Sequence, residues 1–201
     1  MRELNGLELQ GFIKERQAKQ VRNLRQQFRI IPKLLIVMSE HASDVIHTYV
    51  RMKQRYAADI LIDVDIVTVT QSEIPQVIKR ANADALVHGV IVQLPLDNPD
   101  QTDEICNLIA PKKDVDGLGA EAEYVSATAE AIDWLLTGYN VELRDKHIVL
   151  LGHGKLVGAP LAKLWKSRGL QVTVLDEHSD RVAETLQRSD VIVSATGVPR
   201  I

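Results

Sequence analysis

The feature that most constrains this chain is a regular alternation between short apolar runs and longer segments with helical spacing. The apolar runs are rich in Val, Ile and Leu and have the length of strands. Such a β-α-β alternation predicts parallel sheets joined by helical crossovers, so the expected fold class is α/β. The predicted strands are 34–38, 62–69, 85–92, 148–151, 171–175 and 191–195, and the predicted helices are 7–28, 42–59, 72–82, 102–110, 129–139, 160–168 and 181–188.

Composition narrows the function classes. The 201 residues suffice for one large domain or two small ones, and the net charge of −3 gives no reason to expect a nucleic-acid or membrane partner. Aromatic residues make up only 4% of the chain, which argues against a base-stacking surface. One cysteine, Cys106, cannot form an internal disulfide, which is consistent with a cytoplasmic location, and we expect it to be a buried helix residue. The six histidines show no ligand spacing, so no metal is predicted.

A glycine loop, 152-GHGKLVGAP-160, follows one predicted strand and opens a helix. Glycines at 152, 154 and 158 let the backbone approach a pyrophosphate, and a helix N-terminus supplies free N–H groups. The spacing is GxGxxxG, and a bare glycine turn is the alternative. The strand and helix on either side favour nucleotide binding, with His153 and Lys155 in the same loop.

Two acidic residues, Asp176 and Glu177, follow the next predicted strand. A carboxylate at this place accepts hydrogen bonds from a ribose 2′-hydroxyl and repels a 2′-phosphate. The pair therefore favours NAD over NADP. A solvated strand end is the alternative interpretation.

Three further places carry polar side chains that could serve a second site. Gln93 ends the apolar run 85–92 just before Pro95, as a residue at the carboxyl edge of a parallel sheet would, although a strand may simply end there. Tyr49 and Lys53 lie four apart and share a helix face, where an exposed lysine beside a half-buried tyrosine is the plainer interpretation.

The third place is a loop, 112-KKDVDG-117, that contains two carboxylates, Asp114 and Asp116. One such pair supplies too few ligands for a metal site. A turn is the plain interpretation, and hydrogen bonding to an aminopyrimidine-like ligand is the alternative.

Together these segments resemble one family, the bifunctional methylenetetrahydrofolate dehydrogenase/cyclohydrolase. The matching segments are 49-YVRMK-53, 89-GVIVQLPL-96, 112-KKDVDG-117 and 152-GHGKLVGAP-160, and weaker similarity covers nearly the whole chain. The resemblance implies an N-terminal α/β folate-binding domain (1–120) and a doubly wound Rossmann-type domain (121–201). It also implies oxidation of 5,10-methylenetetrahydrofolate with a nicotinamide cofactor, usually NADP, then hydrolysis to 10-formyltetrahydrofolate, by a homodimer.

The resemblance also assigns roles to residues. Lys53 would be the central catalytic group, and Gln93 would hold both Lys53 and the substrate. Tyr49 would pack on the folate, and Asp116 would bind the pterin ring. Gly152, Gly154 and Gly158 would line the cofactor site. We therefore expect Gln93 to lie within hydrogen-bonding reach of Lys53.

The chain also departs from the family pattern. A proline-containing segment is replaced by 126-SATA-129, an Arg-Ser pair by His153 and Gly154, and a common proline by Asp97. The chain ends just after the third strand of the second domain, so that domain is expected to be truncated. Two other functions stay open: a different nicotinamide dehydrogenase of the shikimate-dehydrogenase type, and a non-catalytic folate- or nucleotide-binding remnant.

Overall fold

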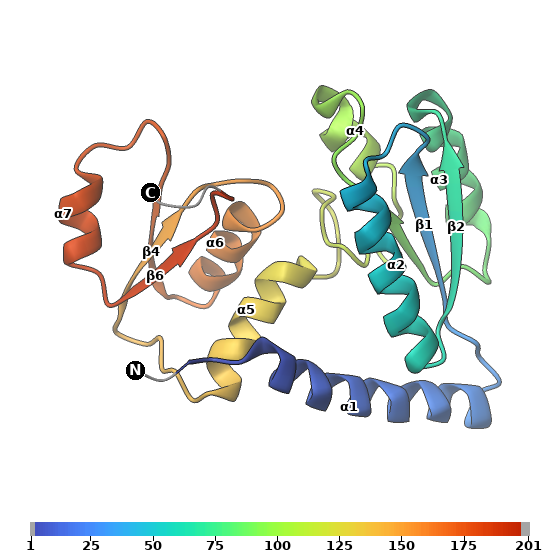
Figure 1. The fold of residues 1–201 in the computed structure, drawn as a ribbon, viewed down its shortest axis with the longest axis horizontal. Coiled ribbons are helices and arrows are strands. Elements are labelled where there is room, and N and C mark those ends of the chain that lie inside the picture. The colour runs from blue at the N-terminus through green and yellow to red at the C-terminus, as the bar shows by residue number, and fades with distance from the viewer. Residues whose placement is uncertain (1–2, 198–201) are drawn as a thin grey trace. The chain divides into compact units, whose positions relative to one another are not determined.

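The computed structural model describes residues 3–197, and the chain divides into two compact units, one of Asn5–Tyr124 and the other of Val125 onward together with residues 3–4. Each unit contains a parallel sheet of three strands with helices packed on it (Figure 1). The expected α/β class is therefore confirmed in both units.

The first unit has the strand order β2-β1-β3. The first strand of this unit is thus the central one, and Ile36 pairs in register with Ile66 on one side and Ile91 on the other. The elements are α1 (Gly6–Gln27), β1 (Lys33–Ser39), α2 (Asp44–Asp59), β2 (Asp63–Val69), a 3₁₀ turn (Gln71–Glu73), α3 (Ile74–Ala83), β3 (Gly89–Val92), a 3₁₀ turn (Pro99–Gln101) and α4 (Thr102–Cys106).

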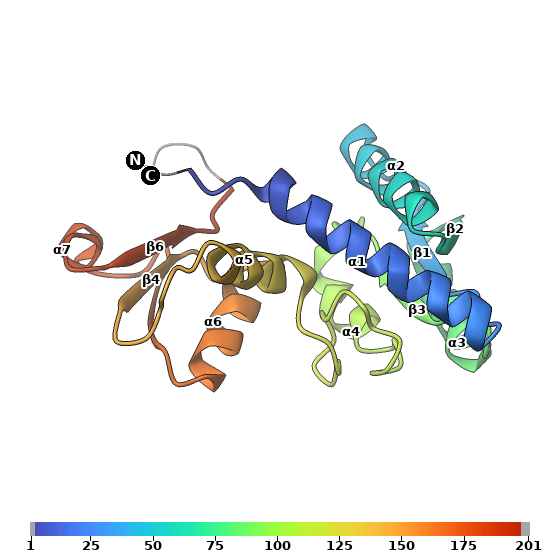
Figure 2. The same cartoon turned by 90° about the horizontal axis from the view of Figure 1, so that it is seen from below.

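Helices cover both faces of this first sheet. Successive side chains of β1 alternate between the faces, so Leu35 and Val37 join the cluster of α3 and α4, whereas Ile36 and Met38 join the cluster of α2. Figure 2 shows α2 on one side of the strands and α3 with α4 on the other. A sheet buried on both faces requires strands that are apolar at nearly every position, which is the composition of β1.

Helix α1 lies on the surface of the first unit, and most of its side chains are exposed or half-buried. Val21 is its one buried residue among those described. Polar contacts attach it to α2 and the turn that follows: Tyr56 Oη donates to Gln17 Oε1 at 2.7 Å, and Arg25 Nη1 donates to the Leu61 carbonyl at 2.9 Å. Along the described residues, no helix has both the length and the apolar character needed to cross a bilayer.

The second unit has the strand order β5-β4-β6, again with its first strand in the centre. Its core is formed by β4 and α6, with Trp165 fully buried against Ile148 and Leu150. At the site of the replaced proline segment, Ser126 is buried and its Oγ donates to the Leu156 carbonyl at 3.2 Å. The elements are α5 (Ala127–Gly138), β4 (His147–Leu151), α6 (Gly158–Ser167), β5 (Gln171–Leu175), α7 (Val182–Gln187) and β6 (Val191–Ser194).

The predicted strand 85–92 was too long at its start. Strand β3 begins at Gly89, because Asp84 closes a turn by accepting from the Leu86 N–H at 2.8 Å, and Leu86 is 69% exposed. This turn brings the chain from α3 back to the sheet.

Two helix predictions were also wrong in detail. The helix predicted over 72–82 begins later, at Ile74, since Thr70 and Glu73 form a reciprocal capping box around the preceding 3₁₀ turn. The helix predicted over 102–110 ends at Cys106, because the N–H groups of Leu108 and Ile109 bond three residues back and the Ala110 N–H is taken by Asn82 Oδ1 at 2.9 Å. Cys106 is buried, as expected.

We expect Asp133→Ala to lower the free energy of unfolding by about 1–3 kcal/mol, because a buried indole N–H would lose its acceptor. Asp133 is 6% exposed and accepts from Trp165 Nε1 at 3.0 Å and from Arg168 Nη1 at 2.7 Å. Urea denaturation of the whole chain measures the effect. Asp133→Asn, which keeps an acceptor for Trp165, should cost less, and equal stability of Asp133→Ala and the parent chain would contradict the role.

Candidate functional site

Both sheets have a switch point at the carboxyl end of the central strand. A strand order with the first strand in the middle sends the chain first to one side and then to the other, and ligands of open α/β folds bind where those directions diverge. In the first unit this place lies beyond Ser39 and Val92, and in the second beyond Leu151 and Ser194. Most of the residues singled out from the sequence lie at these two edges.

Gln93 lies at the first of these edges and contacts Lys53. The backbone N–H of Gln93 donates to the Val37 carbonyl at 2.8 Å, so the residue continues the pairing of β3 with β1. Its Oε1 accepts from Lys53 Nζ at 2.9 Å, which confirms the contact predicted from the sequence. Its Nε2 donates to the Leu94 carbonyl at 3.2 Å. Because that bond fixes the amide orientation, the oxygen faces the amine.

Helix α2 presents Tyr49 one turn before Lys53. Ser43 caps the helix, with its Oγ accepting from the Ile46 N–H. Tyr49 is 57% exposed, so its ring face is open to a flat ligand beside the amine. The helix therefore offers an aromatic surface and a hydrogen-bonding amine on one face.

Two residues of the loop 112–117 stabilise the fold through hydrogen bonds to backbone groups. Lys113 Nζ donates to the carbonyls of Ala81, Asn82 and Asp84 at 2.7–3.1 Å, which satisfies the C-terminal end of α3. Asp114 is 1% exposed and accepts from two backbone N–H groups, Gly117 at 3.0 Å and Gly119 at 2.7 Å. The plain interpretation as a turn therefore applies to Asp114.

Asp116 of the same loop is in a different situation. Desolvation by burial raises the pKa of its carboxyl, and the neighbouring Asp114 raises it further, whereas the charge of Lys53 lowers it. Within residues 3–197 its carboxylate has no hydrogen-bond donor. A desolvated carboxyl without a donor is suited to accept N–H groups from a ligand.

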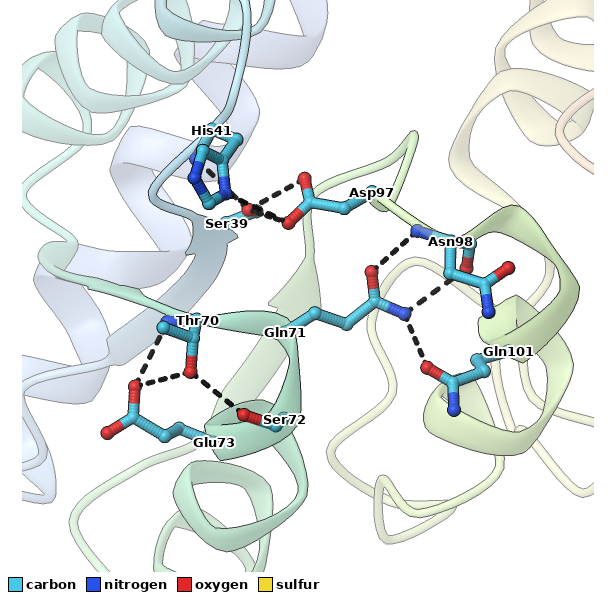
Figure 3. A network of polar contacts seen from close by, with 9 residues as sticks. All are labelled: Ser39, His41, Thr70, Gln71, Ser72, Glu73, Asp97, Asn98 and Gln101. Atoms are coloured by element: carbon cyan, nitrogen blue, oxygen red, sulfur yellow. Dashed lines mark hydrogen bonds and ion pairs between the residues drawn. The ribbon is translucent and has the colours of Figure 1, made fainter.

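A polar network that sequence reasoning missed anchors the loop after Gln93 (Figure 3). Ser39, at the end of β1, is buried and its Oγ lies 2.8 and 2.7 Å from the two oxygens of Asp97. His41 Nδ1 lies 3.3 Å from Asp97 Oδ2. The bond between Ser39 and Asp97 joins the ends of β1 and β3 across the switch point. The hydrogen bond from Ser39 lowers the pKa of Asp97 below its ordinary value.

A second part of this network ties the same loop to the end of β2 (Figure 3). Gln71 Oε1 accepts from the Asn98 N–H at 2.8 Å, and Gln71 Nε2 donates to Gln101 Oε1 at 2.7 Å. The partners are 27 and 30 residues apart in the chain, so no local sequence signal indicates them. The loop that follows Gln93 is thus held near the ends of both β1 and β2.

In the second unit, close backbone contacts require glycine at two positions of the loop 152–160. Gly152 has φ +95°, and a Cβ there would lie 3.0 Å from the Ala195 carbonyl oxygen. A Cβ on Gly158, the first residue of α6, would lie 2.0 Å from the Gly152 carbonyl oxygen. Gly154 has no atom within 4 Å of such a Cβ. The open side of Gly154 is where a ligand could approach the backbone.

A pocket of about 600 Å³ lies beside this loop. Gly152 and His153 line it from the end of β4, Asp176 and Glu177 from the end of β5, and Thr196 from the end of β6. Its apolar wall is formed by Leu151, Leu175 and Val182. A glycine-bordered pocket with an apolar wall and carboxylates at one end fits the pyrophosphate, adenine and ribose of a dinucleotide. Lys155 lies in the same loop outside the pocket lining. Nowhere in residues 3–197 do three His, Cys, Asp or Glu side chains gather as a metal site would require.

Two family models match the two halves of the chain. The model for the catalytic domain of tetrahydrofolate dehydrogenase/cyclohydrolase matches residues 4–116. The model for the NAD(P)-binding domain of the same enzyme matches residues 126–201. The first match contains the residues of the site in the first unit, and the second match contains those of the pocket in the second unit.

Individual proteins show the same likeness. The bifunctional protein FolD of Streptococcus pyogenes is 34% identical over 209 residues, which cover 96% of this chain and 72% of that protein. The FolD enzyme of Campylobacter jejuni superposes with a TM-score of 0.89 at 27% identity, covering 96% of this chain and 73% of that one. The Trypanosoma brucei enzyme, solved with NADP and an inhibitor, gives a TM-score of 0.89 at 27% identity, covering 97% and 71%.

We expect Asp116→Asn to stabilise the chain at neutral pH. A carboxyl whose folded pKa exceeds its unfolded pKa binds more protons in the native state, so stability falls as pH rises through that interval and stays lower above it. The variant should therefore have the higher urea midpoint at about pH 7, and the difference should shrink below about pH 4, where the carboxyl is protonated in both states.

Asp97→Asn is the matched control, for which we expect the opposite change in stability at neutral pH. The pKa of Asp97 is lowered, so its contribution to stability is present at neutral pH and disappears as pH falls through the folded pKa. The variant should be less stable at about pH 7 and approach the parent chain in acid. A loss of stability in both variants at neutral pH would contradict the assignment for Asp116.

We expect Gly158→Ala and Gly154→Ala to separate folding from ligand binding. Gly158→Ala forces a Cβ against backbone and should lower the unfolding midpoint of the chain. Gly154→Ala meets no atom within 4 Å and should leave that midpoint unchanged while weakening dinucleotide binding. Thermal denaturation and calorimetric titration with NAD⁺ and NADP⁺ measure the two effects. Unchanged binding by Gly154→Ala would show that the open side of the loop does not contact the ligand.

Proposed function

This chain belongs to the tetrahydrofolate dehydrogenase/cyclohydrolase family of NAD(P)-dependent enzymes, and we propose that Lys53, Gln93, Asp116 and Tyr49 carry its folate chemistry. The reactions are oxidation of 5,10-methylenetetrahydrofolate to the methenyl form and its hydrolysis to 10-formyltetrahydrofolate. The observation that carries the proposal is the bond of 2.9 Å between Lys53 Nζ and Gln93 Oε1, with Asp116 close enough for the charge of Lys53 to lower its pKa.

Substrate binding uses Asp116 and Tyr49. The carboxylate of Asp116 accepts from the amino and ring N–H groups of the pterin, which replace the donors that it lacks in the free protein. Such charge-assisted bonds are among the strong ones in a desolvated site. The exposed ring of Tyr49 packs on a flat part of the folate.

The oxidation step removes a hydride from the methylene carbon of the substrate and leaves a methenyl cation. The nicotinamide ring supplies the hydride acceptor when NAD(P) is bound. The protein groups contribute mainly orientation, since hydride transfer depends on alignment of the two carbons. Lys53 and Gln93 hold the folate at the sheet edge for this step.

The hydrolysis step needs water and the transfer of protons. Water held by a hydrogen bond from Lys53 Nζ adds to the methenyl carbon, a C–O bond forms, and one proton of the water is released to solvent. The bond between that carbon and N5 then breaks, the remaining hydroxyl proton passes to N5, and the formyl group stays on N10. Gln93 Oε1 holds the amine in place by accepting one of its N–H groups. The need for an acceptor that holds this amine explains why an amide residue, rather than an apolar one, follows β3.

The two family matches favour this function over the other two. A different nicotinamide dehydrogenase would account for the glycine loop but not for a match to the folate-binding domain over residues 4–116. A binding remnant without activity would keep ligand affinity but show no turnover. On the family resemblance we also propose a cytoplasmic homodimer.

We expect Lys53→Met to abolish hydrolysis of methenyltetrahydrofolate and to reduce the oxidation, by about 10²-fold or more for hydrolysis, while folate binding persists. Lys79→Met makes the same substitution on α3, on the opposite face of the sheet, and should leave both rates unchanged. The absorbance of methenyltetrahydrofolate follows both reactions. Unchanged hydrolysis by Lys53→Met would refute the role of Lys53, and no turnover by the parent chain with either cofactor would favour the remnant.

A further inference from the structure

We propose that the second unit selects NAD over NADP by binding the 2′-hydroxyl of the adenosine ribose with Asp176, which Ser179 holds in position. The inference deepens the proposed function, because it concerns the cofactor of the same enzyme. It rests on the pocket of the second unit alone and involves no residue of the folate site.

Asp176 is the first residue after β5 and lines the pocket beside the glycine loop. In parallel α/β units the pyrophosphate is bound at the loop after the first strand and the adenosine ribose beside the end of the second. Here the first strand is β4, which ends at Leu151 just before Gly152, and the second is β5. The order of the elements therefore places a carboxylate where the ribose hydroxyls would lie.

The carboxylate of Asp176 is held by its own loop. Its Oδ1 accepts from the His178 N–H at 3.0 Å and from Ser179 Oγ at 2.8 Å. The N–H of Asp176 donates to Ser179 Oγ at 2.9 Å. Both bonds from the loop reach Oδ1, so Oδ2 is left for a ligand. A carboxylate fixed by two donors loses little further freedom when it accepts a hydroxyl.

These same bonds keep the carboxylate ionised. The hydrogen bonds from Ser179 and from the His178 backbone lower the pKa of Asp176 below its ordinary value. A charged acceptor forms a stronger bond to a ribose hydroxyl than a neutral one. Ser179 is thus a positioning residue, since it acts on the cofactor through Asp176.

The surrounding charges disfavour a 2′-phosphate. Such a group carries a charge of about −1.5 to −2 and would meet Asp176 and the adjacent Glu177, whose side chain is 86% exposed. Among the described residues, neither lysine nor arginine lines the pocket. The histidines that do are His153 and His178, and His178 Nε2 lies 3.5 Å from Glu177 Oε1.

Isothermal titration of the full chain with NAD⁺ and with NADP⁺, at about pH 8 and without folate, tests the inference. We expect NAD⁺ to bind at least about tenfold more tightly, the lower range for a hydrogen bond to a charged group. Asp176→Asn should remove most of this preference. Ser179→Ala should reduce it, whereas Ser179→Thr, which keeps the hydroxyl, should retain it. Asp180→Asn removes one negative charge from the same loop outside the pocket lining and should leave the ratio unchanged.

Three results would overturn the inference: equal or tighter binding of NADP⁺, an unchanged ratio in Asp176→Asn, or no binding of either dinucleotide. Thermal denaturation of each variant separates a lost hydrogen bond from a misfolded unit. The proposed function fails separately. Turnover with NADP⁺ alone would overturn the NAD selectivity and leave the proposed folate chemistry intact. Selective binding of NAD⁺ without turnover would support the NAD selectivity and contradict the proposed folate chemistry.

Discussion

The position of the first strand at the centre of each sheet is the constraint on which both sites depend. In the orders β2-β1-β3 and β5-β4-β6 the chain must cross first to one side of the central strand and then to the other. Right-handed crossovers in opposite directions pass over opposite faces, so the loops that leave neighbouring strands diverge. In the first unit α2 and α3 pack on opposite faces of β1, as this rule requires. Both groups of candidate site residues lie where the loops diverge.

Residues at an edge where the loops diverge can bind a ligand only when those loops are held in place. In the first unit, side-chain hydrogen bonds hold them. Strand pairing ends at Gln93, and the next residues have no ladder to join. Ser39 holds Asp97 and Gln71 holds the backbone of Asn98, so the loop is attached near the ends of β1 and β2 (Figure 3). These bonds do not contact Lys53. They limit the movement of the loop next to Gln93. In this way a polar network that does not touch Lys53 helps to keep the hydrogen bond between Gln93 and Lys53 in place.

The sequence predicted the regular elements and the contact of Lys53 with Gln93 because both have local signals. Four-residue spacing places Tyr49 and Lys53 on one helix face, and a polar residue after an apolar run marks a strand end. The family resemblance then brought helix and strand end together. The bond between Ser39 and Asp97 has no such signal, because its partners are 58 residues apart, one at the end of a strand and the other in a loop. The loop 112–117 shows the same limit, since Lys113, Asp114 and Asp116 differ in role only through their tertiary neighbours.

Asp114 and Asp116 show why one carboxylate serves the fold and the other is suited to a ligand. Asp114 receives two backbone N–H groups and is buried with its hydrogen-bonding capacity used. Asp116, two residues on, is desolvated without such donors, and the charge of Lys53 only partly offsets the rise in its pKa. The same backbone donors would stabilise Asp116, but they would also occupy the oxygens that a ligand needs. A carboxylate that is to bind N–H groups of a substrate must lack them in the free protein, and the role proposed for Asp116 would account for its destabilisation.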